Sequence, residues 1–169
     1  LDMLNGFCRL TGRDDLYEKN GAAVERQIHE ILQKIPKMEK KPTVLLIRAF
    51  STGAKAKGKD NLAGVILDDL NTDNIVQRYE SLLEDLSLEA IMAADPDYIF
   101  VLDRDAAIQT EGAQLAQEIV ENELVKGTRA YTDGHIVYLS SPAVWYTAEG
   151  GITALDVMLQ DLESELLSQ

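Results

Sequence analysis

The sequence predicts an α/β fold built around a mostly parallel sheet. Three short, mostly apolar runs, residues 43–47, 98–102 and 136–139, have the length and composition of strands that are covered on both faces. The segments between them carry apolar residues at helical spacing. Because strand and helix patterns alternate along the chain, we expect parallel strands with helices on both sides of the sheet.

The first part of the chain predicts one long amphipathic helix. Asp14 and Asp15 supply acidic residues for its first turn, and Pro36 ends it. Its apolar positions recur at helical spacing, at Leu16, Val24, Ile28, Ile31, Leu32 and Ile35. A charged connector then leads to the first strand.

The remaining elements follow in order along the chain. The helices predicted after the first strand cover residues 61–70, 88–94, 112–124 and 152–166. Asp60 or Asn61 is suited to cap the first of these, and Ser87 the second. Residues 74–76 are expected to add a short strand, and Asp133-Gly134 to form the turn before the third long strand.

Length and charge limit the possible functions. A chain of 169 residues with 46% hydrophobic content is enough for one domain, or for one lobe of a larger protein. With 29 acidic against 16 basic residues, the chain is expected to be repelled by nucleic acid and by anionic membranes. The lone Cys8 has no partner for an internal disulfide, and Cys8, His29 and His135 lack the spacing of a zinc site. We found no apolar run of membrane-spanning length and no signal-peptide pattern.

Chemically distinctive residues follow each of the long strands. They are Lys55, Lys57 and Lys59, then Arg104, then Trp145 and Tyr146. Ligands of open α/β sheets bind outside the carboxyl ends of the strands, so these residues predict a binding site there. Each has a plainer interpretation: a solvated lysine loop, an ion pair of Arg104 with Asp103 or Asp105, and an aromatic plug that closes the core.

The lysine loop leaves two functional interpretations open. Gly53 to Lys59 spells G-x-x-x-x-G-K, which is typical of a phosphate-binding P-loop in a nucleotide-binding enzyme. A P-loop requires Ser or Thr directly after the lysine to bind the metal, and this chain has Asp60 there. We favour a local electropositive site for an anionic ligand and retain the nucleotide-binding enzyme as the alternative.

Three stretches resemble the second lobe of class III substrate-binding proteins of ABC importers, which carry ferric siderophores, haem and cobalamin. They are residues 86–104, with Asp95-Pro96-Asp97 and Asp103-Arg104, then residues 121–125, and then residues 130–151, with Trp145-Tyr146 and Gly150-Gly151. The resemblance implies a three-layer, Rossmann-like lobe preceded by a long inter-lobe helix. Residues 1–36 would form the N-terminal segment and linking helix, residues 37–169 the C-terminal α/β lobe, and the first lobe would lie outside this chain.

The resemblance also implies roles for particular residues. Arg104 would point at the oxygens of a siderophore, and Tyr146 would reach the iron centre or its catechols with Trp145 beside it. Lys59 would replace an arginine that relatives carry in the segment matching residues 58–62, and no histidine ligand is expected in residues 77–86. A ferric catecholate is an anion with flat aromatic faces, which suits fixed cations and an aromatic contact.

The function implied is that of the solute-binding component of an ABC importer and not of an enzyme. The ligand expected is a ferric siderophore of catecholate type, with haem or a corrinoid as alternatives, and no resident cofactor is expected. The partner would be an ABC permease in the membrane. Glu121 and Glu123 are conceivable contacts, but in a chain with 29 acidic residues we favour ordinary solvated surface for both. The protein would be extracytoplasmic, in the periplasm or lipid-anchored at the outer face of the cell membrane.

Overall fold

The structure, a computed structural model, divides into two compact units. It describes residues 1–34, 40–51, 53–59, 62–78, 88–108, 116–123, 125–147 and 151–166. One unit combines residues 1–37 with residues 148–169, and the other comprises residues 38–147. The final helix therefore groups with the N-terminal helices and not with the sheet. The caps predicted at Asp60, Asn61 and Ser87 lie outside the described residues.

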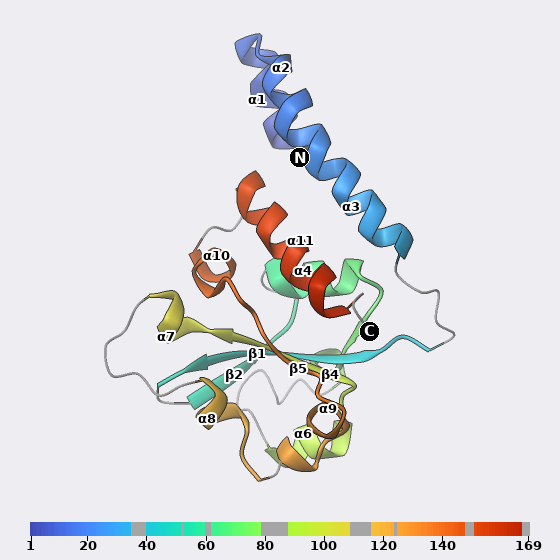
Figure 1. Ribbon diagram of the computed structural model, residues 1–169, viewed down its shortest axis with the longest axis vertical. Coiled ribbons are helices and arrows are strands. Elements are labelled where there is room, and N and C mark those ends of the chain that lie inside the picture. Colours follow the sequence, from blue (N-terminus) through green and yellow to red (C-terminus); the bar gives the residue numbers. More distant parts are fainter. Residues whose placement is uncertain are drawn as a thin grey trace. The chain divides into compact units, whose positions relative to one another are not determined.

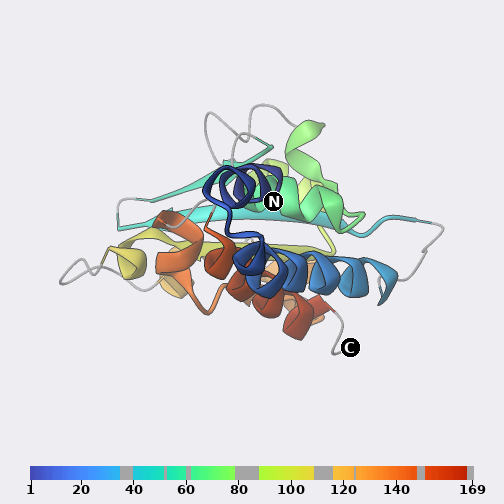
Figure 2. The same cartoon turned by 90° about the horizontal axis from the view of Figure 1, so that it is seen from above.

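The first unit is helical. It contains α1 (Asp2–Thr11), α2 (Asp14–Leu16), the π-helical turn η1 (Tyr17–Gly21), α3 (Ala22–Lys34) and α11 (Ile152–Leu166). The long helix predicted from Asp14 is present, although the π-turn interrupts its α-helical hydrogen bonding. The helix α1 was not predicted, and it ends at Gly12, whose φ of 66° is the left-handed conformation that glycine adopts readily. The helices α3 and α11 lie side by side, as Figures 1 and 2 both show.

The second unit is built on a five-stranded sheet. Its strands are β1 (Thr43–Phe50), β2 (Gly53–Lys57), β3 (Asp73–Asn74), β4 (Tyr98–Asp103) and β5 (Ile136–Tyr138). The main path runs β2-β1-β4-β5, and β3 pairs with the start of β1. Every pairing is parallel except that of β1 with β2. The predicted mostly parallel α/β sheet is therefore confirmed.

Helices cover both faces of this sheet. In Figure 1, α4 (Leu62–Asp69) and α10 (Pro142–Thr147) lie on one face, and α6 (Leu88–Ala94), α8 (Ala116–Val120) and α9 (Arg129–Thr132) lie on the other. The short elements are α7 (Arg104–Ala107) and the 3-10 turns η2 (Ile75–Gln77) and η3 (Val125–Gly127). Residues Leu45, Ile47 and Ala49 of β1 share a buried cluster with residues of α6, α8 and α9. The alternate residues of β1 consequently point to the face of α4 and α10.

Two segments that the sequence predicted as loops are regular elements. Residues 53–57 form β2, an edge strand in which Ala56 is buried and Lys55 is exposed. Alanine, lysine and glycine have low strand propensity, so pairing with β1 and not intrinsic preference makes this strand. Trp145 and Tyr146 lie within α10, which begins at Pro142, a residue well suited to the first helical position.

Smaller differences concern element ends. The strand predicted at residues 74–76 is β3 followed directly by η2. Of the helix predicted over residues 112–124, α8 is the described part, and residues 109–115 lie outside the description. The turn at Gly134 is present, with a φ of 77°.

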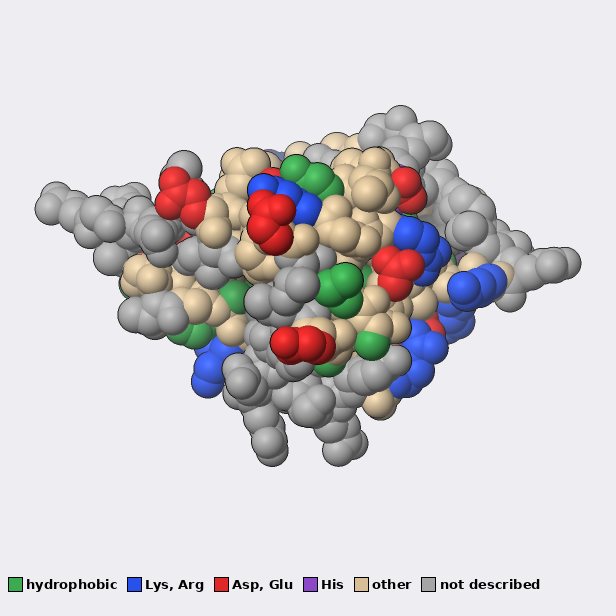
Figure 3. All heavy atoms as spheres, turned by 90° about the horizontal axis from the view of Figure 1, so that it is seen from below, with side chains coloured by type: hydrophobic (Ala, Val, Ile, Leu, Met, Phe, Trp, Pro, Cys, Tyr) green, Lys and Arg blue, Asp and Glu red, His purple; other side chains and the backbone are tan. Residues whose placement is uncertain are grey.

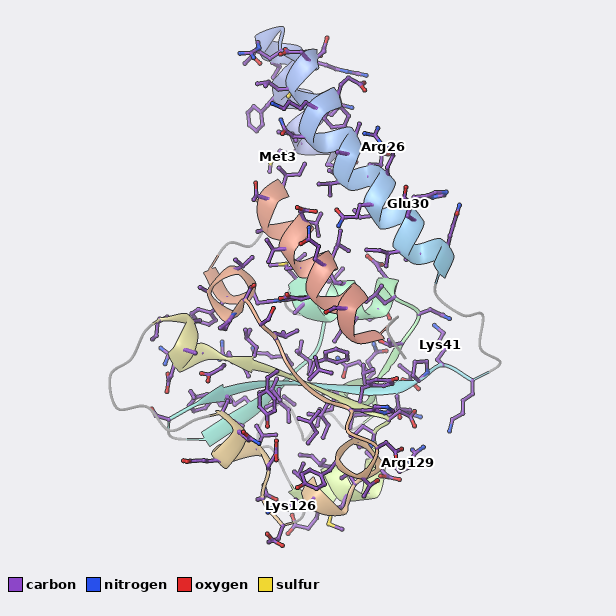
Figure 4. The ribbon with its side chains drawn as sticks, in the orientation of Figure 1. Met3, Arg26, Glu30, Lys41, Lys126 and Arg129 are labelled. Atoms are coloured by element: carbon purple, nitrogen blue, oxygen red, sulfur yellow. The ribbon has the colours of Figure 1, made fainter. Side chains whose placement is uncertain are left out.

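At the amino-terminal edge of the sheet, an arginine joins α9 to β4. The Arg129 side chain, labelled in Figure 4, donates to Asp95 at 2.7 Å and to Asp97 at 2.6 Å. The other carboxylate oxygen of Asp97 accepts from the backbone N–H and the hydroxyl of Thr43, each at 2.7 Å. The Asp95-Pro96-Asp97 turn therefore has a structural role at the edge opposite the predicted site.

Candidate ligand-binding site

Arg104 and Tyr146 meet at the carboxyl end of β4. The Asp103 side chain accepts from the N–H of Ala106 at 2.9 Å, which starts α7 and makes Arg104 its first residue. From there, Arg104 Nε donates to the Tyr146 hydroxyl oxygen at 3.3 Å. The guanidinium carbon lies 5.9 Å from the centre of the Tyr146 ring, within cation–π range. The structure thus brings together two predicted site residues that are 42 positions apart.

A buried carboxylate fixes the arginine. Asp105, with 3% of its surface exposed, accepts from Arg104 Nη1 at 3.3 Å and from the backbone N–H of Ser51. Ser51 directly follows β1, so Asp105 ties α7 to the end of the neighbouring strand. The predicted ion pair of Arg104 is present, and it positions the arginine without enclosing it, since 40% of the Arg104 side chain remains exposed.

The contact changes the acidity of both groups. The hydrogen bond from Arg104 lowers the pKa of the half-buried Tyr146, and the positive charges of Arg104 and Arg48 lower it further. The same hydrogen bond raises the pKa of Arg104. Because the arginine donates to the phenol oxygen, the hydroxyl proton of Tyr146 is left to donate to a ligand. The pair can therefore present N–H and O–H donors together to an anionic oxygen.

Trp145 does not share this position. Its side chain is 4% exposed and belongs to the core, so the structure does not bring Trp145 to the surface beside Arg104 and Tyr146, and its predicted contact with the ligand stays a prediction. Consecutive helical residues point about 100° apart, which sends Trp145 inward while Tyr146 faces Arg104. The plainer interpretation, an aromatic plug for the core, holds for the tryptophan alone.

Lys59 lies away from the pair. In the register of the sheet, Lys57 is level with Leu46, whereas Asp103 is level with Ala49. That offset corresponds to about 10 Å along the strands, and the two chains continue in opposite directions from these points. Lys59 Nζ instead pairs with Asp68 at 2.8 Å. The structure therefore corrects the prediction that places Lys59 on the same rim as Arg104 and Tyr146.

The P-loop interpretation of Gly53 to Lys59 fails on the same geometry. Residues 53–57 pair with β1 from Phe50 to Leu46, so their backbone forms a ladder and does not curl around a phosphate. Phosphate cradling requires successive N–H groups that point into one concavity. The nucleotide-binding enzyme is not favoured.

The described part of the chain offers little other site chemistry. No group of three or more His, Cys, Asp or Glu side chains within it is placed to hold a metal ion. None of its helices is both long enough and apolar enough to span a bilayer. On the face seen in Figure 3, several basic side chains gather along the right-hand edge, and acidic side chains are scattered over the rest of the face. Glu121 accepts from the Tyr138 hydroxyl at 2.8 Å, and Glu123 pairs with Lys126 at 3.0 Å.

The family assignment follows from comparison with known proteins. A family model described as periplasmic binding protein matches residues 2–143. The chain belongs to the periplasmic binding protein family. Its fold and relatives place it in class III of these binding proteins, as the sequence motifs predicted.

Two relatives illustrate the match to this binding protein. The petrobactin-binding protein YclQ of Bacillus subtilis is 28% identical over 160 residues, which cover 94% of this chain and 49% of YclQ. The solved structure of YclQ superposes with a TM-score of 0.77 at 26% identity, covering 96% of this chain and 56% of YclQ. A TroA-like periplasmic binding protein from Xylanimonas cellulosilytica gives a TM-score of 0.81 at 27% identity, with coverage of 96% and 56%.

A further relative is more distant. The ferric-anguibactin-binding protein FatB of Vibrio anguillarum is 22% identical over 152 residues, which cover 89% of this chain and 46% of FatB. The chain spans about half the length of the curated relatives it matches. The names of these relatives describe binding proteins and not enzymes.

Proposed function

We propose that this chain is the second lobe, with its linking helix, of the solute-binding component of an ABC importer. It binds an anionic ferric siderophore of catecholate type in a cleft that a first lobe completes. The protein works outside the cytoplasm, in the periplasm or anchored by a lipid, and delivers its ligand to a membrane permease. It performs no chemistry on the ligand.

The observation that carries this proposal is the contact between Arg104 and Tyr146 at the carboxyl edge of the sheet. A guanidinium can hold two oxygens in one plane, and a phenol adds both a donor and an aromatic face. A ferric catecholate offers clustered anionic oxygens and flat rings, so it matches this pair. Among the described residues of the site, no nucleophile and base are arranged as catalysis would require.

The names of the relatives support the ligand class. One is a petrobactin-binding protein and another a ferric-anguibactin-binding protein, so both are named for siderophores. Because the matched region is about half of each relative, a two-lobed protein is the natural counterpart of this chain. The apolar side chains Met3, Phe7 and Leu10 of α1 are exposed in the described unit, and we assign them to contact with the first lobe.

The test is a fluorescence titration of the two-lobed protein with a ferric tris-catecholate. Trp145, the single tryptophan of this chain, should be quenched by energy transfer to the iron complex even though it is buried. Arg104→Ala should weaken affinity at least tenfold, and Tyr146→Phe should weaken it by a smaller factor because the ring remains. Lys126→Ala is the matched control, because Lys126 is a cation of the same unit that lies near α9 and pairs with Glu123.

Distinct outcomes separate the alternatives. Equal affinities for the wild-type protein and Arg104→Ala would remove Arg104 from the site. Haem and a corrinoid serve as competing ligands, and tighter binding of either would refute the catecholate assignment. A thermal-shift assay with Mg-ATP should show no stabilisation, whereas a nucleotide-binding protein would be stabilised.

A further inference from the structure

A second cation, Arg48, lies near the Arg104–Tyr146 contact. Arg48 of β1 is paired with Leu102 of β4 on one side and with Lys55 of β2 on the other. Residues Leu45, Ile47 and Ala49 point into the core cluster, so Arg48 points to the opposite face, on which α10 and Tyr146 lie. Its charge reaches Tyr146, whose pKa it helps to lower.

Within the part of the chain that the structure describes, no ion pair balances the charges of Arg48 and Lys55. The Nε atom of Arg48 is buried, and among the described residues it has no hydrogen-bond partner. Lys55 stands directly across the strand pair, and like charges in that relation destabilise a sheet. No carboxylate of the described residues pairs with either side chain, and the nearby Asp105 is committed to Arg104 and Ser51.

This arrangement costs stability in the ligand-free protein. A buried polar atom without a partner is destabilising, and such atoms in native proteins call for an explanation. The chain carries a net charge of −13 and has many acids available for pairing, yet it leaves two cations together at this edge. An anion bound there would neutralise both of them, with the partly exposed Arg48 side chain and the exposed Lys55 as its contacts.

We propose that Arg48 and Lys55 form a second anion-binding contact that selects a negatively charged chelate over a neutral or cationic one. This inference rests on the proposed function of the Arg104–Tyr146 site. Arg104 and Tyr146 hold one part of the ligand, and Arg48 receives oxygens on the neighbouring strand. Arg48, and not Lys59, then supplies the additional positive charge of the site.

The variant that tests this is Arg48→Met, which removes the charge and keeps a long side chain. In the two-lobed protein, its affinity for a ferric tris-catecholate, an anion, should fall at least tenfold. Its affinity for ferrioxamine B, a cationic ferric hydroxamate, should not fall, so selectivity between the two should collapse. Lys41→Gln is the control, because Lys41 is an exposed cation before the start of the same strand (Figure 4).

Two further measurements distinguish a loss of ligand binding from a loss of folding. Lys55→Gln changes an exposed residue and should reduce the affinity for the anionic ligand by about twofold to fivefold, as expected for a solvated charge. In the ligand-free protein, Arg48→Met should keep or raise the unfolding temperature, and the pKa of Tyr146, followed by NMR of its ring carbon, should rise.

The outcomes distinguish this inference from the function on which it rests. Arg104→Ala could weaken binding of the tris-catecholate while Arg48→Met and Lys55→Gln bind it as the wild type does. That result would overturn the second anion-binding contact and leave the proposed function standing. A wild-type protein that binds neither ligand overturns both proposals.

Discussion

The substitution Gly64→Ala tests the close approach between α4 and the end of β2. Gly64 lies in the first turn of α4, and a Cβ atom placed on it would stand 1.9 Å from the carbonyl oxygen of Gly58 and 2.7 Å from its carbonyl carbon. Real Cβ contacts are essentially never shorter than 3.0 Å, so α4 and the backbone after β2 would have to separate by more than 1 Å. Neither atom can rotate away, because both belong to the main chain.

Two opposing effects determine the size of the change. Alanine favours a helix over glycine by about 1 kcal/mol. Overpacking that forces a backbone shift costs about 3 kcal/mol at the upper end of its usual range. The net expectation is a loss of about 2 kcal/mol in the free energy of unfolding of the sheet-containing unit. With a urea m-value of about 1.5 kcal/mol per molar for a unit of this size, the midpoint should fall by more than 1 M.

The assay is urea unfolding followed by Trp145 fluorescence, because Trp145 lies in the same unit as Gly64. The control is Gly6→Ala in the middle of α1, where an added Cβ would meet no atom within 4 Å. That substitution should stabilise α1 by about 0.5–1 kcal/mol, measured by far-UV circular dichroism. If Gly64→Ala is as stabilising as the control, the contact of α4 with Gly58 does not exist as described.

Three further predictions concern the site and its supports. Asp105→Ala should lower the unfolding free energy of the sheet-containing unit, measured in urea, by about 1–3 kcal/mol, because the backbone N–H of Ser51 loses its charged acceptor. A loss below about 0.5 kcal/mol would contradict that role. Burial alone would raise the pKa of Asp97, but hydrogen bonds from Thr43 and the charge of Arg129 lower it overall. The resulting stabilisation is present above the ordinary carboxyl pKa of about 4 and is lost as pH falls through the lowered pKa of Asp97. The difference in unfolding free energy between the wild type and Arg129→Gln should therefore shrink on acidification. A difference that does not depend on pH would refute this. Phe7→Ser should reduce self-association of the isolated chain in sedimentation velocity, and unchanged sedimentation would argue against an exposed apolar face on α1.

The parts of the fold that the sequence predicted are those with strong apolar patterns. The runs beginning at residues 43, 98 and 136 became β1, β4 and β5, because uniformly apolar, β-branched segments are stable only in a buried sheet. The strand β2 was missed, since Gly53-Ala54-Lys55-Ala56-Lys57 forms a strand only through its partner β1. The composition of the segment alone does not predict such pairing.

The site was predictable to the extent that it follows parallel strands. The position of Arg104 at the carboxyl end of the sheet was predictable because Arg104 directly follows a parallel strand, where the rule for α/β sheets applies. Lys59 was misplaced because the rule was applied to a segment that turns back antiparallel and carries its lysines toward the amino-terminal edge. Arg48 was overlooked because it lies inside an apolar strand, where sequence patterns predict core.

The hairpin of β1 and β2 explains why the charges of this site lie where they do. The chain turns back after Phe50, so Lys55 of β2 lies directly across from Arg48 of β1. On the other side of β1, Arg48 pairs with Leu102 of β4, and Arg104 follows two residues later. Cations that are distant in sequence are thereby placed on adjacent strands of a chain whose net charge is strongly negative. Such a chain repels anions in general. For the anionic ligand that we propose, the local row of cations would supply the attraction, and binding should weaken with rising ionic strength.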